Sequence, residues 1–132
     1  MKYADIVTEV QESAAIPDLL EADRVTRATI DVLGRRLAAC PNRLVAYRLP
    51  SPLASELHEE QEAPQEFSIT EFYERVAERT RLTTAEARRR ARAVVHALGS
   101  VLPSTDLQEM FRELPGEYLD LLGVNTGPDL AR

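Results

Sequence analysis

A cluster of basic side chains between residues 88 and 96 is the part of the sequence whose residue types could most directly do chemistry. The basic strip, as we call it, consists of Arg88, Arg89, Arg92 and His96 on one predicted helix, where residues three and four apart are neighbours. Guanidinium groups bind carboxylates and phosphates through charge-assisted hydrogen bonds, so the strip could hold an anion or a partner protein. The same groups could instead tie this helix to a carboxylate or to the C-terminus of another helix, and we favour that structural interpretation.

The charge of the whole chain argues against a nucleic-acid binder. The 132 residues include 16 Lys and Arg against 22 Asp and Glu, which gives a formal net charge of −6. Nucleic-acid binding depends mainly on clustered positive charge. Four acids close in sequence would neutralise the basic strip: Glu71, Glu74, Glu78 and Glu86. We therefore predict a solvated, salt-bridged face, and keep as the alternative a nucleic-acid-associated regulator that uses the Arg88–Arg92 helix face.

The sequence contains no pattern that is typical of an enzyme, a metal centre or a cofactor site. Its two histidines are His58 and His96 and its one cysteine is Cys40, so it offers neither paired cysteines nor a His-Glu-x-x-His motif for zinc. A glycine-rich phosphate loop and a Gly-x-Ser-x-Gly turn are also missing. We predict that the protein is not an enzyme and has no catalytic, cofactor-binding or metal-binding residues, with Cys40 an ordinary thiol.

The elements that must position the basic strip belong to an internal duplication. Residues 21–57 and 86–122, which are 65 positions apart, are identical at 11 of 37 positions. The shared arginines are the pairs Arg24 with Arg89 and Arg27 with Arg92. Upstream the shift becomes 66, and the one-residue slip falls where a loop would absorb it. Such ordered repetition predicts two copies of one structural unit.

The spacing of apolar residues is helical along the chain and predicts an all-α fold. Tyr3, Ile6, Val7 and Val10 follow the i, i+3, i+4, i+7 pattern of a helix face, and no segment alternates as a strand would. We predict a helical bundle of two pseudo-symmetric four-helix repeats that share a core around their second helices. The eight expected helices are 3–13, 18–37, 42–48, 51–60, 68–81, 84–102, 105–113 and 115–122. They form one domain over 1–122, with repeat one at 1–60, a linker at 61–66, repeat two at 67–122 and a flexible tail at 123–132.

The sequence also predicts where three helices begin and which side chains are buried in the core. Three hydroxyl residues stand three positions before a Glu or Gln, as in a capping box. These residues are Ser68, Thr83 and Thr105, which precede Glu71, Glu86 and Gln108. The apolar stripes of the two long helices predict that Ile30, Leu33, Val95 and Leu98 are almost fully buried.

Symmetry between the repeats sets the expected roles of the arginines. Arg27 and Arg92 occur in both copies, so we expect each to serve packing, bonded within its own repeat to a carboxylate or to helix-end carbonyls. The recurring acids that could pair with them are Glu12 and Glu78. Arg88 and Arg90 have no arginine counterpart in repeat one, so we expect them to be more exposed and more easily replaced.

The repeated motif also resembles a known family. The pattern Ala-x-Arg-x-x-Arg-Ala-x-x-x-x-Leu-Gly-x-x-Leu stands at 22–37 and again at 87–102, and Leu-Pro follows each copy, at 49–50 and 114–115. Over nearly the whole chain this is similar to a family of small, duplicated, all-helical bacterial proteins catalogued as a domain of unknown function. The resemblance implies an all-helical fold and a bacterial origin. It implies no activity and no site residues, because none is established for the family.

These expectations favour binding over catalysis. Our leading hypothesis is a non-catalytic binding or scaffold module that acts through protein–protein interaction. Besides the nucleic-acid alternative, a deep pocket with convergent polar groups would favour an enzyme or a small-ligand binder. A lone cysteine, no signal-peptide pattern and no apolar run near ~18 residues predict a cytoplasmic protein that does not span a membrane.

Overall fold

The all-α class is confirmed by a computed structural model that describes residues 2–37, 46, 48–57 and 63–123. Within these ranges every regular element is a helix and no residue is in a strand. The elements are α1 (Tyr3–Ser13), α2 (Leu19–Arg36), α4 (Ser51–Ala54), α5 (Ile69–Thr80), α6 (Thr84–Leu98), α7 (Ser104–Arg112) and the 3-10 helix η1 (Gly116–Leu122).

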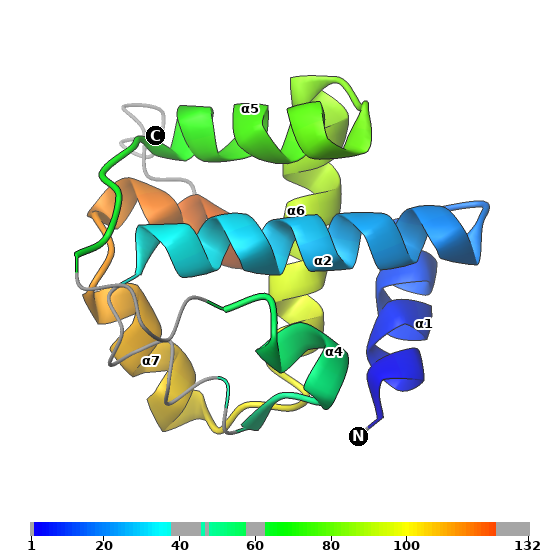
Figure 1. Ribbon diagram of the computed structural model, residues 1–132, viewed down its shortest axis with the longest axis horizontal. Coiled ribbons are helices and arrows are strands. Elements are labelled where there is room, and N and C mark those ends of the chain that lie inside the picture. The colour runs from blue at the N-terminus through cyan, green and yellow to red at the C-terminus, as the bar shows by residue number, and fades with distance from the viewer. Residues whose placement is uncertain (1, 38–45, 47, 58–62, 124–132) are drawn as a thin grey trace.

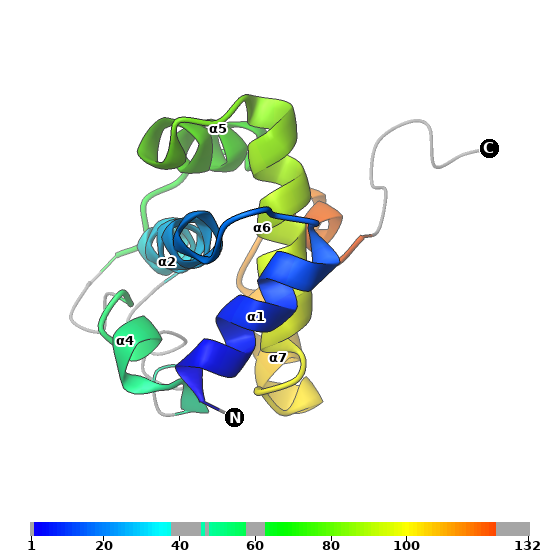
Figure 2. The same ribbon diagram turned by 90° about the vertical axis from the view of Figure 1, so that its right-hand side faces the viewer.

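The two longest helices, α2 and α6, cross at the centre of the molecule (Figure 1). Both contact α1, α5 and each other, and α6 also contacts η1. Figure 2 shows α1 running beside α6, while α5 lies along α2. The prediction that these two long helices lie at the centre of one core is therefore confirmed.

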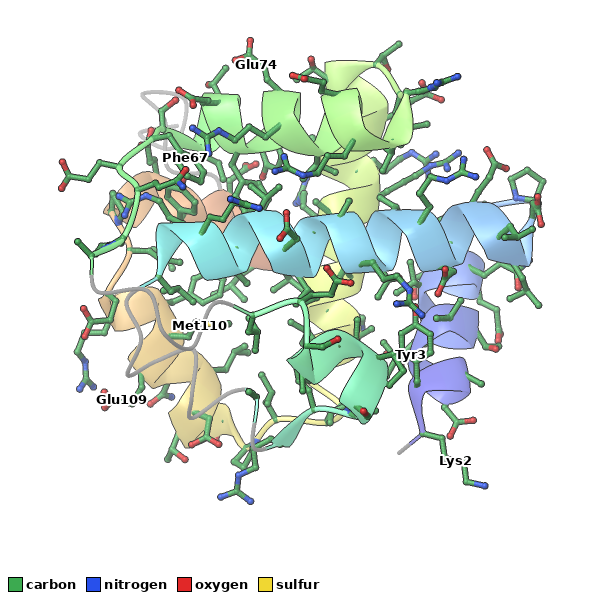
Figure 3. The ribbon with its side chains drawn as sticks, viewed as in Figure 1. Lys2, Tyr3, Phe67, Glu74, Glu109 and Met110 are labelled. Carbon is green, nitrogen blue, oxygen red and sulfur yellow. The ribbon has the colours of Figure 1, made fainter. Side chains whose placement is uncertain are left out.

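One apolar cluster takes its side chains from both predicted repeats. Ile30 and Leu33 of α2 are 1% exposed, and Val95 and Leu98 of α6 are 0% exposed, as expected from their helical spacing. The shorter helices add one face each to this cluster. On α7, for example, Met110 points into the core while Glu109 points to solvent (Figure 3).

Side-chain caps begin α5 and α6 where the sequence predicts them. The Ser68 hydroxyl accepts a hydrogen bond from the backbone N–H of Glu71 at 3.1 Å. Thr83 and Glu86 form a complete capping box, with reciprocal bonds of 3.1 and 3.2 Å to each other's backbone N–H. The cap predicted at Thr105 is wrong, because α7 begins earlier, at Ser104, directly after Pro103. The fixed φ of proline suits that entry position, and it places Thr105 inside the first turn.

Several predicted boundaries differ from the observed ones. The helix expected at 51–60 ends at Ala54, and the segment expected as an α-helix at 115–122 is the 3-10 helix η1. The helix expected at 84–102 ends at Leu98, although the backbone N–H of Leu102 still bonds to the Leu98 carbonyl at 2.8 Å. Most of the helix expected at 42–48 and all but the first residue of the tail lie outside the described residues. The two-repeat symmetry stays a prediction.

Candidate functional site

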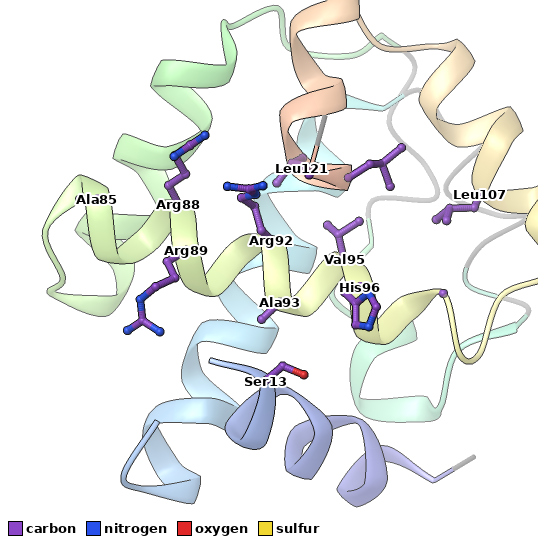
Figure 4. A pocket seen from close by; sticks show the side chains of 13 residues that line it. Ser13, Ala85, Arg88, Arg89, Arg92, Ala93, Val95, His96, Leu107 and Leu121 are labelled. Carbon is purple, nitrogen blue, oxygen red and sulfur yellow. The ribbon is translucent and has the colours of Figure 1, made fainter. Parts of the chain in front are cut away.

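A pocket of about 680 Å³ lies beside α6, between the end of α1 and η1 (Figure 4). All four residues of the basic strip line it: Arg88, Arg89, Arg92 and His96. Ser13 contributes from α1, and the apolar lining includes Val95, Leu107, Leu121 and Leu122. The pocket therefore combines cationic groups from one helix with leucines from α7 and η1.

The basic strip faces the pocket because the other sides of α6 pack against the core. Ala87, Ala91 and Val94 are 0% exposed and pack against neighbouring helices. With 3.6 residues per turn, the outward face of the helix is left to Arg89, His96 and part of Arg92. The capping box fixes the first turn of α6 and so the register of this face.

Arg88 is a structural residue that fixes the wall of the pocket. Its Nε and Nη2 atoms donate to the two carboxylate oxygens of Asp120 in η1, both at 2.8 Å. The Tyr73 hydroxyl of α5 donates to the same carboxylate at 2.6 Å. The hydrogen bonds from Arg88, and then that from Tyr73, hold the pKa of Asp120 below its usual range. Burial, followed by the bond to Asp120, raises the pKa of Tyr73.

This ion pair leads to the opposite of the expectation from sequence, namely that replacing Arg88 weakens the fold. Arg88 has no arginine counterpart in repeat one, but its partner Asp120 has no acidic counterpart either, since Ser55 stands 65 positions earlier. Residues 21–57 therefore hold no equivalent of this ion pair. Symmetry cannot reveal a contact that only one copy makes.

Arg90 also departs from the prediction, because it is buried rather than exposed. It is 7% exposed, and its Nη1 atom lies 4.0 Å from Glu21 Oε1 of α2. Position 90 falls on the side of α6 that packs against α2, where the aliphatic stem of an arginine can cover apolar surface. Its Nε atom has no hydrogen-bond partner among the described residues.

Arg89 and His96 stand at opposite ends of the strip. A guanidinium N–H of Arg89 donates to the backbone carbonyl of Ala14, where α1 ends. The positive charge suits the negative end of that helix. His96 is exposed, one turn beyond Arg92. Figure 4 shows Arg89 projecting to the α1 side of the pocket.

Arg92 differs from the other arginines of the basic strip in its contacts. It is partly exposed and projects toward η1, and it forms no hydrogen bond or ion pair with any described residue (Figure 4). The prediction that it is bonded within its own repeat is wrong. Its charge acts on the nearby Asp120, whose pKa it lowers further, but Arg88 and Tyr73 already satisfy that carboxylate.

Arg27, the counterpart of Arg92, does behave as predicted. It bonds to Asp23 at 3.1 Å and lies 3.8 Å from Glu56, both within the predicted repeat one. Asp23 stands four residues before Arg27, and the residue four before Arg92 is Arg88, which has the same charge. The local partner of Arg27 is therefore replaced by a cation in the second copy. The recurring acids Glu12 and Glu78 form no ion pair with any described residue and are partners of neither arginine.

The leucines of η1 are pocket residues that sequence reasoning missed. Tyr118 and Leu121 are 0% and 1% exposed, whereas Leu119 and Leu122 are 36% and 42% exposed. Residues three apart eclipse each other in a 3-10 helix, so one pair is buried and the other faces out. The signal in the sequence is the apolar run Tyr-Leu-x-Leu-Leu, which has more apolar positions than one buried face needs.

Metal and membrane sites find no support in the described part of the chain. Within residues 2–37, 46, 48–57 and 63–123, no three His, Cys, Asp or Glu side chains gather as a metal site. No helix in these ranges has the length and apolar character needed to cross a bilayer. Cys40 and His58 lie outside them.

In the part of the chain that the structure describes, the protein is a small all-helical domain whose pocket is lined by basic and apolar side chains. Residues 3–121 match the model of the family described as "Uncharacterized conserved protein (DUF2267)", and the chain belongs to that family. The match confirms the resemblance to a domain of unknown function. Comparison with curated proteins gives no match.

Proposed function

We propose that this protein is a non-catalytic binding module that captures a segment of another protein in the pocket beside α6. The observation that supports the proposal is Arg92. It is a partly exposed guanidinium with no bonding partner among the described residues, inside a pocket of about 680 Å³. A charge-assisted bond to a carboxylate would satisfy it. We keep the cytoplasm as the expected location, because the chain has a single cysteine.

The chemistry of the pocket favours binding over catalysis. Its charged side chains are the arginines of the basic strip, Arg88, Arg89 and Arg92, and guanidinium groups bind and orient anions. Hydrolysis or group transfer also requires an activated nucleophile beside a base. Ser13 and His96 are the pocket residues that could supply such a pair, and no hydrogen bond joins them in the described structure.

The contacts of the basic strip weaken the nucleic-acid alternative. Of the five basic residues between 88 and 96, Arg90 is buried and Arg88 is bound to Asp120. Arg89 already donates to the Ala14 carbonyl at the end of α1, so Arg92 and the exposed part of Arg89 are the arginines of this face without an ion pair to a described residue. Duplex or single-stranded binding usually needs a longer basic surface.

A quantitative pull-down tests the proposal. The bait is tagged full-length protein in lysate of its native cells, as wild type, Arg92→Gln and Arg24→Gln. Arg24 is the matched control, because it is an exposed arginine without a hydrogen bond or ion pair among the described residues and does not line the pocket. Mass spectrometry compares the recovered proteins, and the nucleic acid recovered is measured in parallel.

We expect at least one protein whose recovery falls about tenfold with Arg92→Gln, as the loss of one charged contact would produce. The same protein should be recovered equally with Arg24→Gln and with wild type. Equal recovery with all three baits would contradict the proposal. Arg92-dependent recovery of nucleic acid instead of protein would favour the alternative.

A further inference from the structure

The basic pocket continues into an apolar depression between α7 and η1. This second depression has a volume of about 470 Å³, and Leu107 and Leu122 line both cavities. Phe111 of α7 and Leu119 of η1 complete its apolar lining. The two cavities therefore adjoin, and we call them together the groove, with the arginines of the basic strip at its α6 end and a mainly apolar lining at its α7 end. Arg112 also lines the α7 end, where it pairs with Glu109 at 2.6 Å.

Two of the four large exposed apolar side chains in the described part of the chain lie at this groove. Among the described residues, the large hydrophobic side chains that are exposed are Leu19, Leu20, Leu119 and Leu122. The last two line the depression, and the first two begin α2. Apolar surface that adjoins a concave site is typical of an interaction surface, because its contact with a partner removes it from water.

Contacts within the protein itself hold the wall of the groove in place. The Tyr118 hydroxyl of η1 donates to the Phe67 carbonyl at 2.7 Å, and the Arg88–Asp120 pair holds the same 3-10 helix against α6. Leu121, at 1% exposure, anchors η1 in the core. A wall fixed in this way need not be ordered on binding, which lowers the entropic cost of association.

We propose that this groove binds an acidic amphipathic helix of a partner protein. Its carboxylates would contact Arg92, Arg89 and His96, and its apolar side chains would fill the depression between α7 and η1. This inference rests on the proposed function and narrows the partner to one class of segment. Helices that lay an apolar face into a groove are a common mode of peptide recognition.

Charge and apolar contact must act together at this site. The chain carries a net charge of −6, so an acidic ligand is repelled at long range and attracted only by the local cations. An ion pair that stays exposed contributes about 0–1 kcal/mol, and one that the bound partner shields from water, as at Arg92, contributes the roughly 1.4 kcal/mol of a tenfold change. The apolar contact must therefore supply much of the affinity, and the cations select which amphipathic helix enters the groove.

The test uses three fluorescein-labelled synthetic peptides and the purified full-length protein. The first is an acidic helix with leucines at i, i+3, i+4 and i+7 and glutamates beside them. In the second, serine replaces every leucine, and in the third, glutamine replaces every glutamate. Fluorescence anisotropy gives the affinity of each peptide for wild type and for four variants. Leu122→Ser and Arg92→Gln alter the groove, while Leu20→Ser and Arg24→Gln are matched exposed controls.

We expect the first peptide to bind wild type about tenfold or more tightly than either of the other two. Leu122→Ser and Arg92→Gln should each weaken that binding by a similar factor, and neither control should change it. Equal binding of the leucine-free peptide would overturn the apolar part of the inference. No binding of any peptide would overturn the inference as a whole, while the pull-down still decides the proposed function.

The purified protein must also be analysed alone by sedimentation velocity. We expect a single species whose size does not change with Leu122→Ser. Self-association that is lost with Leu122→Ser and with Leu20→Ser would overturn the choice of partner. In that case a second copy of this chain, through its exposed Leu19–Leu20 surface, would be the occupant of the groove.

Discussion

Replacing Arg88 with alanine should destabilise the protein by about 1–2 kcal/mol, because it removes the clamp on η1. The lost interactions are two charge-assisted hydrogen bonds of 2.8 Å to Asp120. Such bonds contribute roughly 1.5–3 kcal/mol when well shielded. The Arg88 side chain is 43% exposed, so solvent screens the pair and lowers its contribution. Asp120 keeps the bond from Tyr73, which limits the cost of the unpaired carboxylate.

Arg92→Ala is the matched comparison, and it should cost less than about 0.5 kcal/mol, as surface substitutions usually do. Arg92 lies four residues from Arg88 on the same helix, but it has no bond to any described residue that could be lost. Urea unfolding followed by circular dichroism measures both changes. With an m-value of about 2 kcal/mol/M, Arg88→Ala should lower the midpoint by about 0.5–1 M, and Arg92→Ala should leave it within about 0.25 M of wild type.

Two results would refute this reasoning. The first is an Arg92→Ala variant that is destabilised as much as Arg88→Ala, since Arg92 would then have a structural partner. The second comes from a double-mutant cycle with Asp120→Asn, in which Arg88→Ala should cost much less than in wild type. If Arg88→Ala lowers the free energy of unfolding equally in the Asp120→Asn background and in wild type, the Asp120 carboxylate is not the cause of the destabilisation.

Two further predictions concern the core and the buried tyrosines. The Leu98 side chain is 0% exposed, so Leu98→Ala should destabilise the protein by roughly 2–5 kcal/mol through lost transfer free energy and a cavity. Leu20→Ala is the control and should have little effect, because Leu20 is 65% exposed. A melting temperature of Leu98→Ala within about 2 °C of wild type would show that Leu98 is not in the core. Burial raises the pKa of Tyr73, and of Tyr118 to about 12, above the ordinary value of 10.0. The folded state therefore favours the neutral phenols, so their stabilising effect is complete below about pH 10 and is lost as the pH rises through the folded-state pKa values. Urea unfolding from pH 9 to 12 should show this loss, and an equally steep loss in Tyr73→Phe would contradict the contribution of Tyr73.

Features that depend on near neighbours in sequence could be predicted well. The buried stripe of α6, which includes Val95 and Leu98, follows from the 3.6-residue period, since a helix has one set of positions that can face the core. The Thr83 capping box is equally local, because both partners lie within four residues. The central place of α2 and α6 follows from their length and from the small residues that let neighbouring helices approach.

Features that depend on distant partners could not be predicted in this way. Arg88 is separated by 32 residues from Asp120, and nothing near Arg88 indicates that η1 brings an acid to it. The apolar end of the groove requires knowing that η1 packs against α6 beside α7, which is a property of the tertiary structure. The position of η1 likewise involves a distant contact, because the Tyr118 hydroxyl donates to the Phe67 carbonyl 51 residues away.

The contrast between Arg27 and Arg92 shows where the symmetry argument failed. The two arginines correspond under the 65-residue shift, but the residue four positions earlier is Asp23 in one segment and Arg88 in the other. Asp23 neutralises Arg27 locally, at 3.1 Å. Arg88 instead repels Arg92 and binds the acid that Arg92 would otherwise reach. Two differences in residue type, Asp23 against Arg88 and Ser55 against Asp120, therefore account for the ion pair that holds η1 and for an Arg92 guanidinium without a hydrogen bond or ion pair to any described residue. The position of a residue in a repeat indicates where its side chain lies, but the charge of its neighbours decides whether that side chain is already bonded or remains available to a ligand.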